Sequence, residues 1–300
     1  MFEKLFAESG FSLDRLRALL EVGAAGSIVN AARGDPVRQS QYSRQIGELE
    51  DFFRTRLIER HGKGTRLTPN GRELARISRF FMLGLSNFRR GCLTEEQTFR
   101  IGASATFNHH FLVPAISGPL LRNHGGRYVS EIATKDEVER RLHELILDFG
   151  VVGQAELSRP LQTKTVGEWN VELWVPKAMG LSQAKAAQAF ERGELPLAMA
   201  RELDDLDVRL NKGRDAILVC NSFLDSFVAL EGKKVAALLP GFLAPKKNAR
   251  SFVRVQMPKI DSQVFRFHLA WNPRLLRLNP HAVRQRDWLV HILSKQIAGP

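Results

Sequence analysis

The chain has 300 residues, more than one hydrophobic core usually serves, so two or three domains are expected. Its composition, 44% hydrophobic and 25% charged, is that of an ordinary globular protein, and the absence of any apolar run of about 18 residues excludes a transmembrane helix. The N-terminal segment contains Glu3 and Glu8 and lacks a long apolar stretch, so we expect no secretory signal. The net charge of +12 and the pI near 10.1 favour a polyanionic partner.

Positive charge is densest in the first third of the chain. Up to residue 95 there are sixteen Lys or Arg against eleven Asp or Glu, and fourteen of the sixteen are arginine. Arginine forms forked contacts with phosphate and guanine, which favours a nucleic acid as the partner. A membrane surface is the rival explanation, but it calls for a cationic amphipathic helix or a polybasic tail, and we find neither.

The two cysteines, Cys92 and Cys220, lie far apart and fit a reducing cytoplasm. A redox switch between them is the less favoured alternative. Neither has a Cys or His nearby at metal-ligand spacing, so we expect no metal site and no cofactor.

Three helices are expected near the N-terminus, with a tight turn between the second and the third. A first helix is predicted over Phe11–Val22 with Ser12 as its cap, broken by the glycines of 23–26. Ser27 is expected to cap a short second helix, Ile28–Arg33. The third helix begins either at Asp35-Pro36, a good cap and first-turn pair, or at Gln39.

The third helix has one apolar and one polar face. Its apolar residues, at helical spacing, are Tyr42, Ile46, Leu49 and Phe53. Its polar face carries Arg38, Gln39, Gln41, Arg44 and Gln45. Arginine and glutamine make paired hydrogen bonds to base edges in the major groove, so the stretch is typical of a helix-turn-helix recognition helix. Taken alone, an ordinary pair of surface helices is the competing interpretation.

A β-hairpin is predicted directly after this helix pair. Leu57–Arg60 and Thr65–Thr68 have the pattern of short strands around a glycine-rich tip. Lys63 and Arg66 lie where a hairpin wing would contact phosphates or the minor groove.

A long helix opens at Thr68-Pro69, with Thr as the cap and Pro at the first position. Its apolar positions form a heptad-like seam: Leu74, Ile77, Phe81, Leu85 and Phe88. Such a seam needs a partner, either the helix's own domain or a second chain, and we favour dimerisation.

Residues 11–72 resemble the N-terminal winged helix-turn-helix of LysR-type transcriptional regulators. The matching motifs, at the family's spacing, are Gly26-Ser27, Ala31-Ala32, Gln39, Ser43, Leu49-Glu50, Leu57-Ile58-Glu59-Arg60 and Leu67-Thr68-Pro69-Asn70-Gly71. The chain departs from the pattern at Asp35, where the family usually has leucine, at Ile58 in place of phenylalanine, and at Lys63, where arginine is common. Asp35 stands between Gly34 and Pro36, so we expect a remodelled turn.

The rest of the chain alternates strands and helices. After a polar hinge at Glu95–Thr98, strands are predicted at 99–104, 127–133 and 148–153, with helices at 107–121 and 134–147. This order implies a parallel α/β sheet, in which ligands bind at the carboxyl ends of strands. Ser104, Thr106 and Thr134 occupy those ends, although each could equally be a plain helix cap.

A second α/β set follows, with strands at 171–175, 197–199, 216–220 and 235–239 and helices at 182–192 and 222–230. A strand at 264–271 would return to the first set, before a closing helix at 281–296. This order resembles the LysR effector domain, with two lobes joined by two crossing strands. The motif match is thinner here: Glu131–Thr134 and Leu147–Gly150 resemble family segments, whereas Gly232-Lys233-Lys234 replaces a glycine pair.

The expected fold class is therefore α/β with an all-α-type winged helix-turn-helix head, a long linker helix and a two-lobed effector domain like that of periplasmic binding proteins. The expected domains are residues 1–68 for the head, 69–97 for linker and hinge, and 98–300 for the effector domain. Lobe I is placed at about 98–168 and 269–300, and lobe II at about 169–268.

The resemblance also implies functional residues and partners. Expected DNA-binding residues are Ser27, Arg38, Gln39, Ser40, Gln41, Ser43, Arg44, Gln45, Lys63, Thr65 and Arg66. Expected effector-binding residues are Ser104, Thr106 and Thr134 on lobe I and Arg201 on lobe II. The implied partners are double-stranded promoter DNA, a second copy in a homodimer or homotetramer, a small-molecule effector and RNA polymerase, with no membrane.

An enzymatic α/β domain is the competing hypothesis. The sequence has no glycine-rich phosphate loop, no G-x-S-x-G elbow and no His pair at metal spacing. His109 and His110 are adjacent, so on a helix they point about 100° apart. We therefore expect a regulator and not an enzyme. The alternative is a ligand-binding or enzymatic α/β protein whose helical head does not bind DNA.

Overall fold

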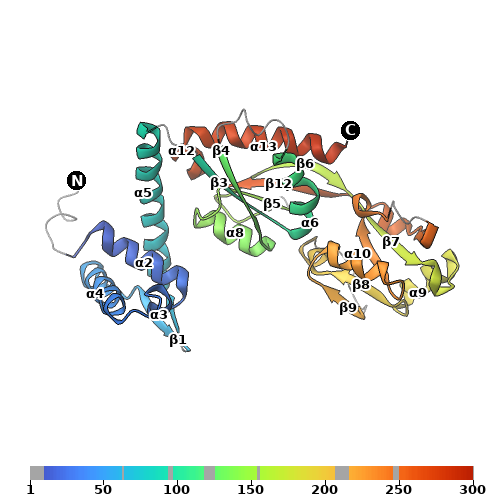
Figure 1. Ribbon diagram of the computed structural model, residues 1–300, viewed down its shortest axis with the longest axis horizontal. Coiled ribbons are helices and arrows are strands. Elements are labelled where there is room, and N and C mark those ends of the chain that lie inside the picture. Colours follow the sequence, from blue (N-terminus) through green and yellow to red (C-terminus); the bar gives the residue numbers. More distant parts are fainter. Residues whose placement is uncertain are drawn as a thin grey trace. The chain divides into compact units, whose positions relative to one another are not determined.

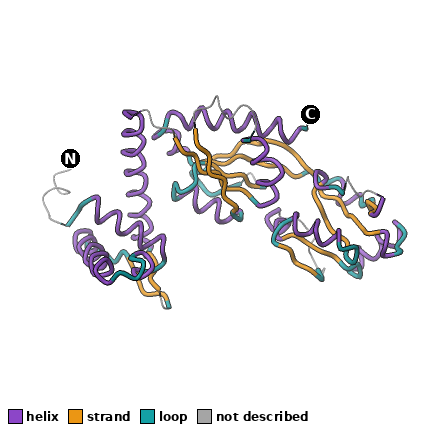
Figure 2. Tube along the Cα trace, in the orientation of Figure 1, coloured by secondary structure: helices purple, strands orange, loops and turns teal. Residues whose placement is uncertain are grey.

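The computed structural model forms two compact units, residues 1–95 and 96–300 (Figure 1). It describes residues 10–62, 64–93, 97–117, 126–153, 156–206, 216–245 and 250–299, without the side chains of 87, 90–93 and 204–206. The first unit is helical with one hairpin, and the second alternates strands and helices (Figure 2).

The first helix of the head, α2, spans Leu13–Ala25 and is capped by Ser12, whose hydroxyl accepts a hydrogen bond from the Arg15 amide. It was expected to end before Gly23, and this was wrong: the helix continues to Gly26, which ends it at φ 69°. Gly23 therefore does not break the helix but allows the hairpin to pack closely against α2. A Cβ at Gly23 would lie 2.7 Å from Leu67 Cδ1 on the second hairpin strand.

The turn before the third helix is built from two successive residues with positive φ. Helix α3, Ile28–Ala31, is capped by Ser27 as predicted and is shorter than expected. Arg33 (φ 52°) and Gly34 (φ 80°) then donate their amides to the carbonyls of Asn30 and Val29. This pair of bonds is a Schellman motif, which satisfies the last carbonyls of α3.

Helix α4 spans Pro36–Phe53, so the earlier of the two predicted starts is the correct one. The Asp35 carboxylate accepts from the Val37 amide at 2.9 Å and from the Arg38 amide at 3.4 Å. Pro36 has no amide to satisfy and occupies the first helical position.

The hairpin and the long helix complete the head. Strands β1 (Ile58–His61) and β2 (Gly64–Leu67) pair antiparallel as predicted. Helix α5, Pro69–Leu93, begins where Thr68 Oγ1 accepts from the Gly71 amide at 3.0 Å. The core joins these elements to α2 and α4 through the buried residues Leu16, Leu19, Leu49, Leu57 and Ala75.

The first sheet of the second unit is mixed, whereas the sequence predicted a parallel one. Its strand order is β4-β3-β5-β12-β6, in which β3 pairs parallel with β4 and β5, and β12 pairs antiparallel with β5 and β6. The bounds are β3 Gln97–Ala103, β4 Gly126–Ile132, β5 Phe149–Val152, β6 Gln162–Trp169 and β12 Phe265–Trp271. Strand β6 was not predicted, because its exposed face is polar and interrupts the apolar pattern.

The hinge was expected at Glu95–Thr98, but Gln97 and Thr98 belong to strand β3. Glu95 and Glu96 lie outside the described residues. Strand β12 belongs to the first sheet over its whole length, although the return to lobe I was placed at residue 269.

Helices cover both faces of the first sheet. Helix α8 and the C-terminal helix α13 lie on opposite faces (Figure 1). Helix α8 is shorter than predicted because Leu145 adopts φ 55° after its end. The helix predicted at 107–121 is seen as α6, a π-helical turn η1 and α7, and residues 118–121 lie outside the described part. The bounds are α6 Ala105–Phe107, η1 Asn108–Leu112, α7 Val113–Ile116, α8 Lys135–His143, α12 Pro273–Leu278 and α13 Pro280–Ala298.

The second sheet belongs to lobe II and has the order β11-β7-β10-β8-β9. Strands β8, β9 and β10 are parallel, while β7 runs antiparallel to both of its neighbours. The strands are β7 Val171–Pro176, β8 Leu197–Ala200, β9 Leu218–Cys220, β10 Ala236–Pro240 and β11 Phe252–Val255. The helices are α9 Gln183–Arg192, η4 Arg201–Leu206, α10 Phe223–Glu231, η6 Gly241–Leu243 and α11 Pro258–Asp261.

The predicted fold class is confirmed: a winged helix-turn-helix head, a long helix and two α/β lobes joined by two crossing segments. Each lobe has its own core, with Val138, Leu142 and Phe149 fully buried in lobe I and Leu230, Ala237 and Leu239 in lobe II. None of the described helices combines the length and apolarity that crossing a membrane requires.

Candidate functional site

The polar face of α4 is exposed to solvent. Only Ile46 and Leu49 of this helix are buried, and Tyr42 and Phe53 are half-buried, so the predicted apolar face points inward. The exposed residues among the predicted DNA contacts are Arg38, Ser40, Gln41, Ser43 and Arg44, and Gln39 and Gln45 are half-buried. One helix therefore presents seven of the eleven predicted contacts.

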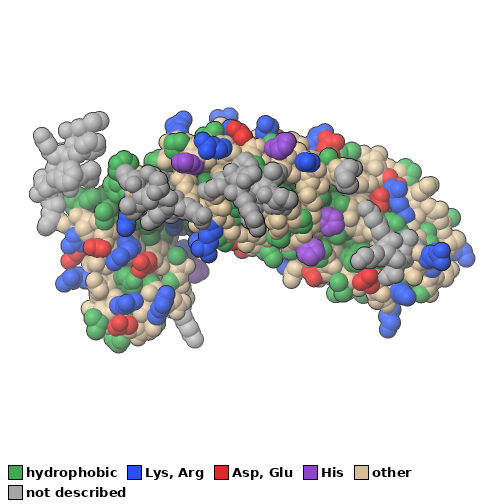
Figure 3. Space-filling view, turned by 45° about the horizontal axis from the view of Figure 1, so that its top comes forward, with side chains coloured by type: hydrophobic (Ala, Val, Ile, Leu, Met, Phe, Trp, Pro, Cys, Tyr) green, Lys and Arg blue, Asp and Glu red, His purple; other side chains and the backbone are tan. Residues whose placement is uncertain are grey.

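Arg38 and Arg44 on this face form only long, exposed ion pairs with acidic side chains. Arg38 Nε lies 3.8 Å from Asp35, and Arg44 Nε lies 3.7 Å from Glu48, with 75% of the Arg44 side chain exposed. Exposed pairs of this kind contribute about 0–1 kcal/mol, so both guanidinium groups are available to an anionic partner. Figure 3 shows positive and negative side chains interspersed on the head, at the left of the view.

Tyr42 fixes α4 against α2. Its hydroxyl donates a hydrogen bond to the Glu21 carboxylate, and this bond raises the pKa of Tyr42 above its usual value. Glu48 makes a second link between the same helices, since it also accepts a hydrogen bond from Arg15 on α2. Both contacts orient the exposed face of α4 relative to the rest of the head.

The wing is fastened to the turn between α2 and α3. The Thr65 amide donates to the Gly26 carbonyl at 2.9 Å, and a Cβ at Gly64 would lie only 2.8 Å from that same oxygen. Thr65 is thereby half-buried, whereas Arg66 is exposed and pairs with Glu59 at 2.7 Å. Lys63, the remaining wing residue, lies outside the described residues.

Ser27 serves as the cap of α3, and its hydroxyl accepts from the Asn30 amide at 3.0 Å. Its place beside Gly26 brings it next to the point where the wing is fastened. The structure thus brings the start of α3, the face of α4 and the described part of the wing into one compact domain.

The seam of α5 is largely exposed in the single chain. Leu74, at its start, packs against the head core. Further along, the exposed fraction is 50% for Ile77, 49% for Phe81, 45% for Leu85 and 74% for Phe88. Large apolar side chains rarely stay exposed in a row along one helix unless another surface covers them.

The second candidate site is a cleft between the two lobes of the second unit. A cavity of about 640 Å³ is lined from lobe I by Ser104, Ile132 and Thr134, and from lobe II by Arg201 and Ser222, among others. A smaller pocket of about 50 Å³ shares Ser104 and Glu202 with it and is lined by Thr106. The four predicted effector residues therefore all line one of two adjoining pockets.

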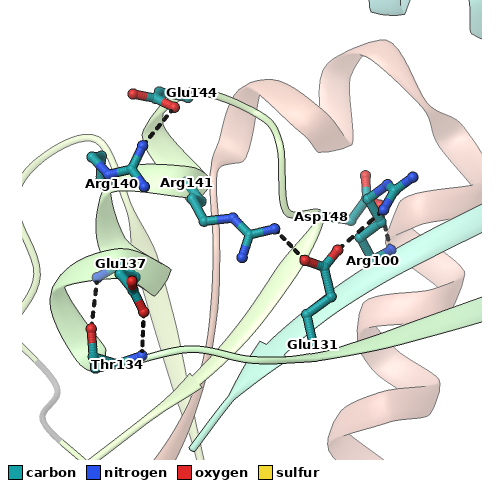
Figure 4. A network of polar contacts seen from close by, with 8 residues as sticks. All are labelled: Arg100, Glu131, Thr134, Glu137, Arg140, Arg141, Glu144 and Asp148. Atoms are coloured by element: carbon teal, nitrogen blue, oxygen red, sulfur yellow. Dashed lines mark hydrogen bonds and ion pairs between the residues drawn. The ribbon is translucent and has the colours of Figure 1, made fainter. Parts of the chain in front are cut away.

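Two of those four residues are helix caps. Ser104 Oγ accepts from the Phe107 amide at 3.3 Å. Thr134 and Glu137 form a reciprocal capping box at the start of α8, and these bonds lower the pKa of Glu137 (Figure 4). Their hydroxyl oxygens each use one lone pair for their own helix, and the O–H group and the second lone pair remain for other contacts.

The end of β4 beside the cleft is held by a network of charges. The Glu131 carboxylate accepts hydrogen bonds from Arg141 and Arg100, and Asp148 accepts from the Arg100 amide at 2.7 Å (Figure 4). The Arg141 bond is the largest cause of the lowered pKa of Glu131. This network fixes the strand that delivers Thr134 to the cavity.

Thr106 differs from the two caps. Its hydroxyl donates to Glu202 of lobe II at 2.6 Å, and its amide donates to the same carboxylate at 3.3 Å. Thr106 is buried and Glu202 is half-buried, so this contact is partly shielded from solvent.

Aromatic rings form the wall of the smaller pocket. Trp169 stacks on Phe267 with centroids 5.3 Å apart, and Phe223 and Phe242 lie edge-on to Trp169. The buried indole Nε1 of Trp169 has no hydrogen-bond acceptor among the described residues. The pocket thus offers a largely aromatic, apolar surface.

Glu202 and the aromatic wall were not predicted from the sequence. Glu202 follows the predicted residue Arg201 directly, but an isolated glutamate on a short helix carries no pattern that marks it. Phe242 and Trp169 come from segments far apart in the sequence, so only folding brings them together. Within the described chain, no three His, Cys, Asp or Glu side chains gather in a way that would hold a metal ion.

The geometry defines a protein with a winged helix-turn-helix surface and a cleft between two α/β lobes. Residues 13–72 match the family described as "Bacterial regulatory helix-turn-helix protein, lysR family". The N-terminal domain is therefore a LysR-type helix-turn-helix, carried on a chain with the fold of full-length LysR-type regulators.

A curated relative is the HTH-type transcriptional regulator HdfR of Yersinia enterocolitica, 25% identical over 161 residues. The match covers 53% of this chain and 55% of HdfR, so the chain spans about half the length of the curated relatives it matches. The matched Yersinia relatives bear the name of transcriptional regulators.

Solved structures share the fold along nearly the whole chain. A full-length variant of OxyR from Pseudomonas aeruginosa has a TM-score of 0.66 at 15% identity and covers 94% of each chain. Full-length CbnR in complex with its target DNA has a TM-score of 0.54 at 14% identity, covering 91% of this chain and 99% of CbnR.

Proposed function

We propose that this protein is a sequence-specific DNA-binding transcriptional regulator of the LysR type that acts in the cytoplasm. The observation that carries the proposal is the LysR-family match over residues 13–72, together with the exposed Arg- and Gln-rich face of α4. HdfR bears the name of a transcriptional regulator, and CbnR is described in complex with its target DNA.

In the proposed mechanism the first half of α4 enters the major groove. Arg38, Gln39 and Arg44 then make contacts to base edges, and the wing residues Lys63 and Arg66 contact the phosphate backbone. Because a LysR operator would be read by two heads, a homodimer or homotetramer is part of the proposal, with the exposed seam of α5 as the dimer contact. RNA polymerase is the proposed partner at the promoter.

A small-molecule effector is proposed to bind between the lobes, against Ser104, Thr106, Thr134 and Arg201. Its binding would change the arrangement of the lobes, and so the spacing of the heads within the oligomer. The cavity of about 640 Å³ lies within the range of small-molecule sites.

The test is a fluorescence anisotropy titration of the full chain with DNA from upstream of its own gene. We expect Gln39→Ala combined with Arg44→Ala to reduce specific binding by about 1–3 kcal/mol for each lost base contact. The matched control is Gln188→Ala combined with Arg192→Ala, which removes the same two residue types from the exposed surface of α9. Equal binding by wild type and the α4 double variant would contradict the proposal.

A further inference from the structure

One carboxylate joins the two lobes across the cleft. Glu202 Oε2 accepts from Thr106 Oγ1 at 2.6 Å and from the Phe223 amide at 2.8 Å, and Oε1 accepts from the Thr106 amide at 3.3 Å. Thr106 belongs to lobe I, whereas Glu202 and Phe223 belong to lobe II. Donors of both lobes therefore meet on one side chain.

These donors would otherwise lack acceptors. The first amides of a helix have no partner within the helix, and Phe223 is the first residue of α10. Thr106 is the second residue of α6, two residues after its cap, so its amide also lies in a first helical turn. Hydrogen bonds to an ionised carboxylate are stronger than neutral ones, so Glu202 satisfies both helix starts and draws them together.

The same three donors form the group that a carboxylate ligand would use. Two backbone amides and a hydroxyl around one point make an anion subsite, and here a side chain of the protein fills it. A ligand carboxylate entering the cleft would have to displace Glu202. The other charged residues of the lining are three acids, Asp136, Glu137 and Asp225, against one arginine, Arg201. Like-charge contact of this kind is unfavourable.

We propose that Glu202 is a resident anion, which fills the anion subsite of the cleft and latches lobe I to lobe II. The cleft consequently selects neutral or cationic effectors over carboxylates. The neighbouring pocket, whose wall is largely aromatic, offers such a ligand an apolar surface. This inference rests on the proposed effector function of the cleft.

Acetate tests the latch directly in the full chain. Glu202→Ala keeps Cβ and removes the atoms that acetate would replace, so the variant should bind acetate where the side chain was. Thermal unfolding is measured in sodium acetate and in sodium chloride at equal ionic strength. In chloride we expect the Tm of Glu202→Ala to fall by about 4–8 °C, since several charge-assisted hydrogen bonds are lost.

Acetate should restore at least half of that loss with a saturating dependence on concentration, while wild type should not respond. Glu202→Gln is the matched control, because its side chain fills the same space and leaves no room for acetate. Isothermal titration should show acetate binding at least tenfold more tightly to Glu202→Ala than to wild type. If Glu202→Ala folds only in acetate and unfolds after dialysis into chloride, the latch is likewise supported.

Three outcomes would overturn the inference: acetate binds wild type as tightly as Glu202→Ala, the variant is destabilised without responding to acetate, or it fails to fold in either salt. None of these measurements uses DNA. If the same wild-type sample does not bind promoter DNA, the proposed function fails whatever acetate does. If it binds DNA and acetate rescue is absent, only the latch is wrong.

Discussion

The head and the cleft between the lobes place their predicted site residues in opposite ways. In the head, the predicted contacts lie within residues 27–66 and most of them project into solvent. In the cleft, residues from 104 to 267 converge, and the polar atoms of Ser104, Thr106 and Thr134 are already bound to helix ends or to Glu202. A surface that binds a large polyanion can keep its polar side chains in water, whereas polar groups withdrawn from water in a cleft are usually hydrogen-bonded within the protein.

Adding a Cβ atom at one glycine of the head should lower the stability of the head strongly. A Cβ at Gly71 would lie 1.9 Å from the Leu57 carbonyl oxygen, which belongs to the backbone and cannot rotate away. We expect Gly71→Ala to destabilise the head by about 3 kcal/mol. Hydrogen exchange of the α2 and α4 amides in the full chain measures this loss.

Gly47→Ala is the matched control, because Gly47 lies inside α4 and a Cβ there would have no atom within 4 Å. It should stabilise the head by about 0.5–1 kcal/mol, the ordinary effect of replacing a helical glycine. Equal effects of the two substitutions would show that the packing of α5 against Leu57 is not as described.

The exposed seam of α5 allows the proposed dimer contact to be tested apart from the fold of the head. Phe81 is half-exposed in the single chain, so Phe81→Ala should leave the fold intact and weaken the proposed dimer by about 2–4 kcal/mol. Sedimentation equilibrium over a concentration series measures the dimer Kd. An unchanged Kd would mean that the seam is covered by something other than a second copy.

The wing should change the salt dependence of DNA binding more than its specificity. Lys63→Ala removes one proposed phosphate contact, which should lower the slope of log K against log salt by about 0.9. Anisotropy titrations at several salt concentrations give that slope. If the variant instead changes sequence preference at constant slope, Lys63 contacts a base.

The smallest expected effect lies in the second unit and depends on pH. Burial, and to a lesser extent Arg266, lowers the pKa of His268 below its usual value of 6.5. The unfolded chain then takes up the proton first, so this contribution leaves stability unchanged above about pH 6.5 and reduces it as the pH falls through that value. His268→Asn should flatten the loss of unfolding free energy between about pH 7 and 5.5, as measured by urea denaturation.

The sequence alone determined the head almost completely. Caps at Ser12, Ser27 and Asp35 act through amides two or three residues away, and the seam of α5 follows from helical spacing. Such interactions are local, so the order of residues fixes them. The exception is Gly23, which resembled a helix break and instead admits Leu67 from the wing.

In the second unit the sequence placed most strands and helices but not their directions or their contacts. The antiparallel strands β7 and β12 and the unpredicted strand β6 depend on pairing partners far along the chain. The link from Thr106 to Glu202 spans 96 residues and joins two lobes. Only tertiary structure could decide it, because a hydrogen bond between separate lobes depends on how both are folded and not on any local pattern.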